Sequence, residues 1–403
     1  MLKLIRLKRF KKFQDVEAHL RPFTVLMGEN SSGKTTILQA INSAMILLAG
    51  SGLVTGTNET LKVKNAGAPM FALPGVILED YKGLFYGNIP RGGKERGTAG
   101  IAIELVDDNG NNYRITINYL FGGLNAKCIS KLKELSNNPT LHLKLPLLIS
   151  GFVGLLPSEE RSYSVALGQK LRSGQMSAII RNILLDTKLK KPESFDRLQK
   201  RLAKDFNFYL DKISFDEQKD VHVTARYKEG SSSTRSFSLD INSSGSGFLQ
   251  ILQILAPIYC FCPDDSSIVL LDEPDAHLHP NLQASLASAL HEIQKELDIQ
   301  IIISTHSTSI IRAADPSEVV PVSSKLKSIQ PLTHSEDVER QILTYIDSYE
   351  LGKSVISGKL VFIEDKDTSI IEAFDKLLKT NCFSGTNTVP MLNWAFAYFG
   401  TPS

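Results

Sequence analysis

Apolar runs typical of strands open the chain and lead into a segment with helical spacing. The segments 2–7, 16–20 and 23–27 are apolar or alternate apolar with polar residues, which is typical of strands. The third segment ends at a glycine-containing loop. Apolar residues then return at helical spacing, at Ile37, Leu38, Ile41, Met45 and Leu48. The order of strand, loop and helix predicts that the chain opens with an α/β unit.

Two β-hairpins are predicted further along. Residues 101–106 and 113–119 are apolar segments on either side of Asp107-Asp108-Asn109-Gly110, which is a turn sequence. Residues 221–227 and 234–241 flank a second loop that is rich in serine and glycine. Both pairs are therefore expected to form antiparallel hairpins.

The rest of the chain predicts helices and two further apolar strands. Residues 165–210 are polar, with apolar positions three or four residues apart, which predicts helices. Apolar runs at 267–271 and 301–304 predict buried strands. The chain is thus expected to have an α/β fold with β-hairpin and helical insertions, the helical region lying at about 125–215. The expected main domain covers 1–345, and a short α/β segment covers 346–403.

Composition indicates an ordinary globular protein. The chain has 403 residues, 42% hydrophobic and 22% charged, and its length allows two or three domains or one fold with large insertions. The four cysteines have no paired spacing, which argues against zinc and disulfides and predicts a reduced, cytoplasmic location. The candidate membrane segments 40–54 and 141–156 are short or broken by polar residues, so no membrane span is expected.

The net charge of +2 does not indicate a class of partner. A nucleic-acid surface would have to be a local patch of basic residues. The candidates are Lys8, Arg9, Lys11, Lys12, Arg91, Lys94 and Arg96. Such runs are more often solvated loops, so nucleic-acid binding is one of two readings of this patch.

The loop after the third strand matches the phosphate-binding pattern G-x-x-x-x-G-K-[ST], in the expected context between a strand and a helix. The nucleotide-binding residues predicted from it are Gly28, Glu29, Asn30, Ser31, Ser32, Gly33, Lys34, Thr35 and Thr36. Backbone amides and the helix N-terminus would bind the phosphates of ATP, and Lys34 would add a positive charge. The Thr35 hydroxyl is expected to bind Mg²⁺.

Two carboxylates end the apolar strand at 267–271. Asp272 is expected to hold Mg²⁺ or its water ligands, and Glu273 to act as general base toward the attacking water. Taken alone, such a strand end is structural about as often as functional. Together with the phosphate loop it predicts ATP hydrolysis.

These motifs resemble the ABC-type ATPases of the RecF and SMC branch, and among those the OLD-like ATPases of bacterial anti-phage systems. The resemblance covers about 1–55 and 235–310. It implies an ABC-type ATPase head that forms a homodimer, or a higher homo-oligomer, with ATP sandwiched between subunits. A partner effector protein, a nuclease, is also implied.

The resemblance assigns two further elements. The turn at Ser243, Ser244 and Gly245, which opens a helix, is similar to the ABC signature; Ser243 with Gly245 is favoured for phosphate contact, and Ser244 is the alternative. His306, after the strand 301–304, resembles the histidine that senses the γ-phosphate. The segment 152–160 is similar to the one between the two lobes of RecF-type proteins, although a plain strand and turn explains it equally well.

The C-terminal strand at 359–363 ends at Glu364 and resembles the first strand of a Toprim domain. A Toprim metal site also requires carboxylates on a later strand, and the sequence has no Asp or Glu after Asp375. The sequence therefore predicts an ATP-dependent dimeric switch that controls a nuclease in anti-phage defence or DNA metabolism. The alternative is an OLD-type nuclease whose own site uses Glu364. A transporter motor has no supporting feature.

Overall fold

The computed structural model describes most of the chain. The described residues are 1–50, 53–55, 60–63, 73, 76, 78, 80–90, 100–120, 123–131, 144–151, 154–172, 176–229, 237–344, 360–363 and 395–398. The chain divides into two compact units, Met1–Thr333 and His334–Ser403, and each is described by itself. Among the described helices, none has the length and apolar character needed to cross a bilayer.

A five-stranded parallel sheet forms the centre of the first unit. Its order is β15-β3-β14-β13-β9. The strands are β3 (Phe23–Met27), β9 (Leu147–Ile149), β13 (Ile268–Asp272), β14 (Gln300–Thr305) and β15 (Val319–Pro321). They consist largely of Val, Ile and Leu, because a parallel sheet is covered on both faces. All five strands point the same way, so their carboxyl ends meet at one edge of the sheet.

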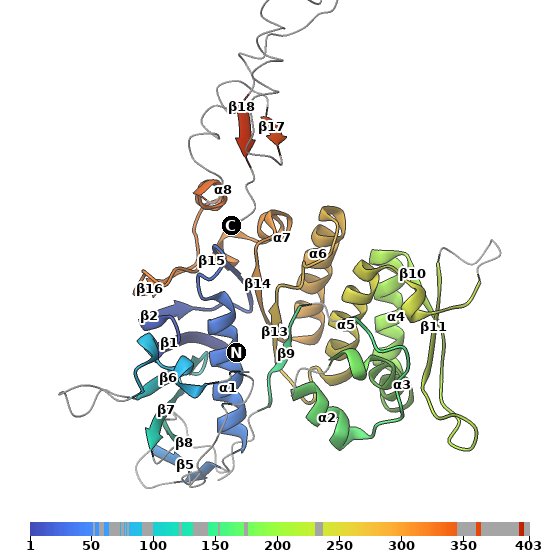
Figure 1. Cartoon of the computed structure of the whole chain (residues 1–403), viewed down its shortest axis with the longest axis horizontal. Helices are drawn as coiled ribbons and strands as arrows, with labels where there is room; N and C mark the ends of the chain where they lie inside the picture. The colour runs from blue at the N-terminus through green and yellow to red at the C-terminus, as the bar shows by residue number, and fades with distance from the viewer. Residues whose placement is uncertain are drawn as a thin grey trace, which may run out of the picture. The chain divides into compact units, whose positions relative to one another are not determined.

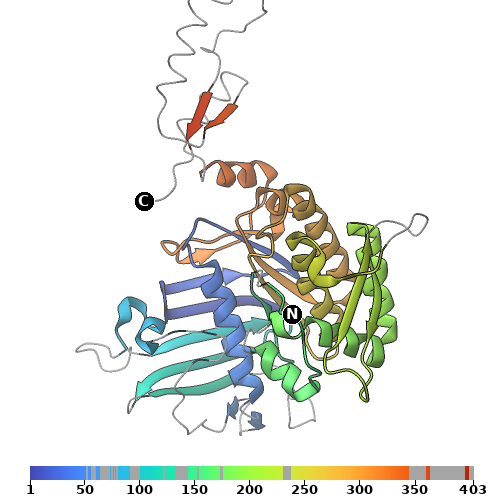
Figure 2. The ribbon, with the colours of Figure 1, turned by 45° about the vertical axis from the view of Figure 1, so that its right-hand side comes forward.

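A second, mainly antiparallel sheet packs with the helix α1 (Lys34–Gly50) to form the main core. Its order is β16-β2-β1-β6-β7-β8-β5-β4. The strands are β1 (Leu2–Phe10), β2 (Phe13–His19), β4 (Leu53–Thr55), β5 (Thr60–Val63), β6 (Ile101–Asp107), β7 (Asn112–Leu120), β8 (Gly123–Lys131) and β16 (Ser328–Ile329). Figures 1 and 2 place α1 between this sheet and the helices of the rest of the unit. The buried cluster joins strands of both sheets to the apolar face of α1.

A helical lobe continues the first unit. Its helices are α2 (Ser164–Arg172), α3 (Ile180–Lys190), α4 (Pro192–Phe206) and α5 (Ser246–Phe261). A small sheet of β10 (Phe208–Ser214), β11 (Thr224–Glu229) and β12 (Leu239–Asp240) belongs to the same lobe, on the right in Figure 1. The expected helices within 165–210 are confirmed by α2, α3 and α4.

The remaining elements are short or lie near the C-terminus. In the first unit they are η1 (Tyr81–Leu84), η2 (Tyr86–Asn88), η3 (Met176–Ala178), η4 (Ile241–Ser243), α6 (Pro280–Leu297), α7 (Thr308–Ala313) and η5 (Pro316–Glu318). In the second they are α8 (Ser335–Thr344), β17 (Leu360–Ile363) and β18 (Ala395–Tyr398). β17 and β18 pair in parallel, so the strand expected at 359–363 is present.

The two expected hairpins differ in outcome. The hairpin at 101–119 is confirmed as β6 and β7, which pair antiparallel from Ile101 opposite Ile117 to Val106 opposite Asn112. The second is confirmed only in part, because β12 has two residues and β11 pairs on its other side with β10. β10 was missed: α4 ends at Phe206, and the next residue, Asn207, has a left-handed φ of 52° that turns the chain out of the helix.

Candidate functional site

The loop between β3 and α1 is shaped by two glycines. A Cβ atom on Gly28 would lie 2.6 Å from both the Ser32 hydroxyl oxygen and the Val322 carbonyl oxygen. Gly33 has a φ of 112°, and a Cβ there would lie 2.4 Å from the Phe13 ring. Because neither position can accept a side chain without displacing backbone or a buried ring, the loop keeps a close turn at the start of α1.

The loop presents amide groups and a helix N-terminus to solvent. Glu29, Asn30 and Ser31 are exposed, whereas Lys34 and Thr36 are buried. The first turn of α1 has no acidic residue. The positive end of the helix dipole is therefore left for an anion.

The amine of Lys34 is held among acceptors. Nζ donates to the carbonyl oxygens of Gly28, at 2.8 Å, and Glu29, at 3.0 Å, and lies 2.8 Å from Nε2 of His306. Burial lowers the pKa of Lys34, and the carboxylate of Glu273 is the largest of the charges that oppose this shift. The amine thus sits between the phosphate loop and the ends of β13 and β14.

Asp272 joins three elements at the carboxyl edge of the parallel sheet. Its Oδ1 accepts a hydrogen bond from Thr35 Oγ1 on α1, at 2.9 Å, and one from Ser304 Oγ on β14, at 2.5 Å. Asp272 and Ser304 are also register partners across β13 and β14. A carboxylate and a hydroxyl in contact are oxygen donors of the kind that Mg²⁺ uses beside nucleotide phosphates.

Glu273 follows in a backbone conformation that is unusual for its residue type. Its φ is 51°, in the left-handed region, and its amide donates to Ser304, to the carbonyl oxygen at 3.0 Å and to Oγ at 3.2 Å. Such a conformation persists only where surrounding contacts hold it. The side chain is half-exposed, so water can reach the carboxylate that the sequence predicts as general base.

His306 contacts both the cation and the carboxylate of the site. The same ring nitrogen, Nε2, lies 2.8 Å from Lys34 Nζ and 3.4 Å from Glu273 Oε1. Burial lowers the pKa of His306, and the positive charge of Lys34 adds to this shift. A neutral imidazole accepts from Lys34, whereas a protonated one would donate to Glu273. The proton on His306 therefore selects between two hydrogen-bond partners.

Polar side chains also support the ends of β13 and β14, and of these the sequence predicted no role for Ser304, Ser307 or Gln283. Asp275 is largely buried, accepts from Thr305 Oγ1 at 2.6 Å, and has its pKa raised by burial. Ser307 Oγ donates to Gln283 Oε1 at 2.7 Å. Together with Ser304, these residues fix the ends of β13 and β14 against α6. The only sequence signal was the run of hydroxyl residues that follows the apolar part of β14.

The signature-like turn lies at the start of α5. Ser243 ends η4 and is exposed, Ser244 follows it, and Gly245 is the N-cap residue of α5. Ser244 Oγ donates to the Ile241 carbonyl oxygen at 2.6 Å. A Cβ atom on Gly245 would meet no neighbouring atom within 4 Å, and the N-cap residue makes no side-chain hydrogen bond to the helix. The turn therefore presents a free helix N-terminus to solvent.

The helix α5 also contacts the turn that follows β13. Gln250, on α5, is buried, and its Nε2 donates a hydrogen bond at 3.0 Å to the carbonyl oxygen of Pro274, the residue directly after Glu273.

His279 is the N-cap residue of α6, where its ring accepts a hydrogen bond from the Asn281 amide. This position gives His279 a helix-capping role.

Most of the predicted basic patch has partners within the chain. Lys8 pairs with Asp15, Arg9 donates to the Ile89 carbonyl, Lys11 to Gln39, and Lys12 to the Ser31 carbonyl of the phosphate loop. The hairpin of β1 and β2 thus supports the phosphate loop through Lys12 and Phe13. Arg91, Lys94 and Arg96 lie outside the described residues, as do Phe152, Val153 and Glu364.

Known proteins with similar sequences or structures include two curated relatives. The OLD nuclease of Thermus scotoductus is 21% identical over 76% of this chain and 59% of its own length. A probable ribonucleotide transport ATP-binding protein of Mycobacterium leprae is 30% identical over 30% of this chain and 33% of its own. The chain thus spans less than two thirds of either relative. An SMC head bound to the C-terminal winged-helix domain of ScpA matches 83% of this chain and 99% of its own, with 14% identity and a TM-score of 0.50.

Two family models match overlapping parts of the chain. Residues 1–144 match an AAA ATPase domain, and residues 125–312 match the model described as “AAA domain, putative AbiEii toxin, Type IV TA system”. The second match contains both Asp272 and Glu273, and the first contains the phosphate loop. Both models describe AAA-type domains and together they match residues 1–312, so the chain carries an ATPase domain. Its fold is that of an SMC head, as the structural match indicates.

The site of the ATPase fits a nucleotide. Among the described residues, Ser32 Oγ is buried and has no hydrogen-bond partner, so the phosphate loop contains an unsatisfied polar group. Thr35 and Asp272 offer oxygen atoms where a cation beside the phosphates would need them. Bound MgATP would supply the phosphoryl group and the charge of the metal, and the residues of the phosphate loop and the ends of β13 and β14 would bind and orient it.

Replacing Lys34 with Ala should abolish detectable ATP binding by the ATPase. Lys34 is the only cationic side chain in residues 28–36, and the loss of one charge-assisted hydrogen bond corresponds to a weakening of about 10- to 150-fold. Isothermal titration calorimetry with ATP would measure it. Lys219→Ala removes an exposed lysine in the helical lobe, far along the chain from the phosphate loop, and should bind ATP like the wild type. Wild-type affinity in Lys34→Ala would contradict the assigned site.

The stability of the ATPase should depend on pH through His306. Because the folded pKa of His306 lies below its ordinary value, the unfolded chain takes up this proton first as the pH falls. Stability is therefore lost as the pH falls through about 6.5, the ordinary pKa of histidine. Lowering the pH from 8 to 5.5 should lower the thermal unfolding temperature of the wild type more than that of His306→Gln. An exposed control, His334→Gln, should follow the wild-type curve, and parallel curves for wild type and His306→Gln would count against this assignment.

Proposed function

We propose that this chain is an ATP-dependent dimeric switch that controls a partner effector. The observation that carries the proposal is the exposed turn at the start of α5. The side chains of this turn make hydrogen bonds within the same chain: Ser244 Oγ donates to the Ile241 carbonyl oxygen, and Asn242 Nδ2 donates to the Leu156 carbonyl oxygen. Ser243 and Gly245 are left facing solvent, where the phosphates of ATP bound by a second copy would meet them.

Each copy then has two half-sites. One half holds ATP with the phosphate loop and the ends of β13 and β14, and the other offers the turn at Ser243. In a two-fold dimer the same pair of surfaces meets twice, so two nucleotides would be enclosed. ATP would stabilise the dimer because it binds both copies, and hydrolysis would release them.

The proposed roles within one site follow from the contacts. Mg²⁺ would be held by Thr35 and Asp272, whose oxygen atoms already lie 2.9 Å apart. Glu273 would act as general base, since its carboxylate is half-exposed and its backbone is fixed by Ser304. His306, in contact with Lys34 and Glu273, would respond to the γ-phosphate.

The proposed effector is a nuclease in anti-phage defence or DNA metabolism. Support comes from the similarity to an OLD nuclease, of which the chain spans 59%. The same similarity favours a second candidate, in which this polypeptide carries its own nuclease site at Glu364. The parallel strands β17 and β18, the first of which ends just before that residue, are compatible with it.

Glu273→Gln should trap the dimer. Glutamine keeps the shape of the side chain but cannot take a proton from water, so hydrolysis should be at least about 100-fold slower while ATP still binds. Size-exclusion chromatography with light scattering should then detect a dimer of the 44.5 kDa chain only when ATP is present. Glu193→Gln, an exposed glutamate at the start of α4, should hydrolyse ATP normally. Normal hydrolysis by Glu273→Gln would place the base elsewhere, and a monomer with ATP bound would refute the switch.

The purified chain should not cleave DNA. The acidic residues near Glu364 all fall in one segment of sequence, whereas two-metal cleavage requires ligands that converge from several strands. A plasmid-cleavage assay with Mg²⁺ or Mn²⁺ and ATP would test this, with Glu364→Ala run beside the wild type. Cleavage that the substitution removes would establish the nuclease alternative; intact ATPase activity without cleavage is the expected outcome.

A further inference from the structure

The turn that carries Ser243 is fixed by an ion pair from a buried arginine. Arg181, at the start of α3, is 2% exposed, and its NH2 lies 3.0 Å from Oδ1 of Asp240, whose side chain is 48% exposed. The same Oδ1 accepts from the Asn242 amide at 2.9 Å and so caps the short helix that ends at Ser243. One carboxylate oxygen therefore connects the buried lobe to the turn.

A second segment holds the turn and the arginine together. Arg181 NH2 donates to the Pro157 carbonyl oxygen at 3.2 Å, and Asn242 Nδ2 donates to the Leu156 carbonyl oxygen at 3.0 Å. The turn at Ser243 is thus attached to residues 154–160 on one side and to α3 on the other.

Residues 154–160 are anchored in the lobe by a buried polar network. Glu159 is 3% exposed, and its two carboxylate oxygens accept from the amides of Arg181, at 3.0 Å, and Asn182, at 3.1 Å. This carboxylate caps the first turn of α3, where the helix dipole favours a negative charge. Burial raises the pKa of Glu159, and the two amide hydrogen bonds oppose that shift.

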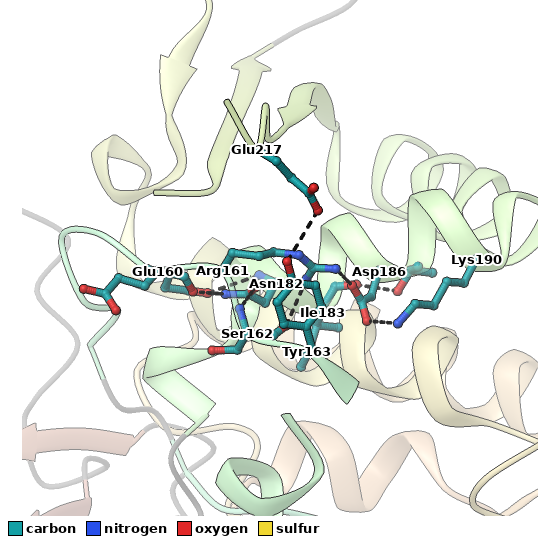
Figure 3. A network of polar contacts seen from close by, with 11 residues as sticks. Glu160, Arg161, Ser162, Tyr163, Asn182, Ile183, Asp186, Lys190 and Glu217 are labelled. Atoms are coloured by element: carbon teal, nitrogen blue, oxygen red, sulfur yellow. Dashed lines mark hydrogen bonds and ion pairs between the residues drawn. The ribbon is translucent and has the colours of Figure 1, made fainter. Parts of the chain in front are cut away.

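The network extends past residue 160, as Figure 3 shows. Arg161 forms an ion pair with Asp186 at 2.5 Å, and the Asn182 side chain accepts from the Ser162 amide at 2.8 Å. The Arg161 guanidinium also lies over the Tyr163 ring, 5.0 Å from its centroid. Buried charges held at both ends in this way allow little displacement of the segment relative to α3.

The other end of this connection lies at the catalytic edge of the sheet. β9 pairs in parallel with β13, and a Cβ on Gly151 would lie 3.7 Å from the carbonyl oxygens of both Asp272 and Glu273. Four residues of chain separate Gly151 from Leu156, whose carbonyl oxygen accepts a hydrogen bond from Asn242. A displacement of the end of β13 therefore needs to pass through only a short stretch of backbone to reach the turn at Ser243.

We propose that Arg181 and Asp240 are positioning residues that hold the Ser243 turn ready for the nucleotide of a second copy. This inference rests on the dimeric switch proposed above and names the residues that make one of its half-sites competent. The ion pair keeps Asp240 in place as the cap of η4, and the cap sets the backbone of Ser243. The hydrogen bonds of the two side chains run to Pro157, to Asn242 and to each other, and not to the phosphate loop, so we expect their effect to fall on the turnover of the opposite site.

The variant Asp240→Ala removes both the ion pair and the cap. We expect its kcat for ATP hydrolysis to fall about tenfold, the size of effect that loss of one helix cap and one half-exposed ion pair gives. Its affinity for ATP, measured by calorimetry on the monomer, should remain that of the wild type. Asp240→Asn keeps an oxygen for the Asn242 amide and should retain more of the turnover.

A matched control is available in the same lobe. Glu292 is 54% exposed and pairs with Arg201, which is 10% exposed, so Glu292→Ala breaks an ion pair of similar burial without touching the turn. Its turnover should equal that of the wild type. An equal loss in Glu292→Ala and Asp240→Ala would mean general loosening of the lobe and would overturn the proposal.

Mixing subunits provides the decisive test. Glu273→Gln binds ATP and offers an intact turn, whereas Asp240→Ala offers an intact catalytic site. The equimolar mixture should recover about a quarter of the wild-type rate, because half of randomly assorted dimers are mixed and each has one complete site. Failure to recover, while Glu273→Gln alone forms the ATP-dependent dimer, would overturn the positioning role. Failure of Glu273→Gln to dimerise would instead overturn the switch, and this inference with it.

If Asp240→Ala does not fold, Asn242→Ala replaces it in the same mixture. That exposed residue loses its bond to the Leu156 carbonyl and leaves the Arg181–Asp240 pair in place. Lower turnover that Glu273→Gln restores is the expected result. Wild-type turnover in Asn242→Ala and in Asp240→Asn would refute the role of these contacts.

Discussion

The carboxyl edge of the parallel sheet is the constraint on which the site depends. β3, β14 and β13 run in the same direction in adjacent positions, so the phosphate loop, His306 and the two carboxylates emerge side by side. One oxygen of Asp272 accepts from both Thr35 and Ser304, which ties the first turn of α1 to β14. A displacement of any of the three elements would break this arrangement.

Charge explains why this edge can respond to a nucleotide. Lys34 lies among carbonyl oxygens and beside His306, and burial lowers the pKa of both side chains. Phosphate groups arriving here would compete with the carbonyls for the lysine and would change the balance between the two partners of His306. The site is therefore arranged so that ligand charge alters contacts already made within the chain.

The helical lobe contributes a surface of a different character. Its interior contains buried charges, Arg181, Glu159 and Asp186, each held by partners from another segment. Removing one partner from such a set is costly, so the lobe holds its shape as a unit. At its edge the start of α5 stays open to solvent, and Gln250 links the same helix to the turn after Glu273. Through Gln250, the helix that begins at the exposed turn therefore contacts the carboxyl edge of the parallel sheet.

The sequence by itself determined the nucleotide-binding elements, because their chemistry is local. A phosphate loop needs its glycines, lysine and threonine at fixed spacing next to a strand and a helix, and an acidic strand end is visible as an apolar run before Asp272 and Glu273. The helices within 165–210 and the hairpin at 101–119 were equally visible from periodicity. The similarity to an OLD nuclease and to AAA domains agrees with that reading.

Only the tertiary structure decided which distant residues meet. Ser304, Asp275 and Gln283 joined the site through strand register and side-chain packing, which no spacing in the sequence encodes. The pairing of Arg181 with Asp240 joins residues separated by 59 positions. Strand β10 was missed because its pairing partner, β11, and not its own pattern, makes it a strand. Local chemistry fixes which residues can bind phosphate; long-range packing fixes what holds them in place.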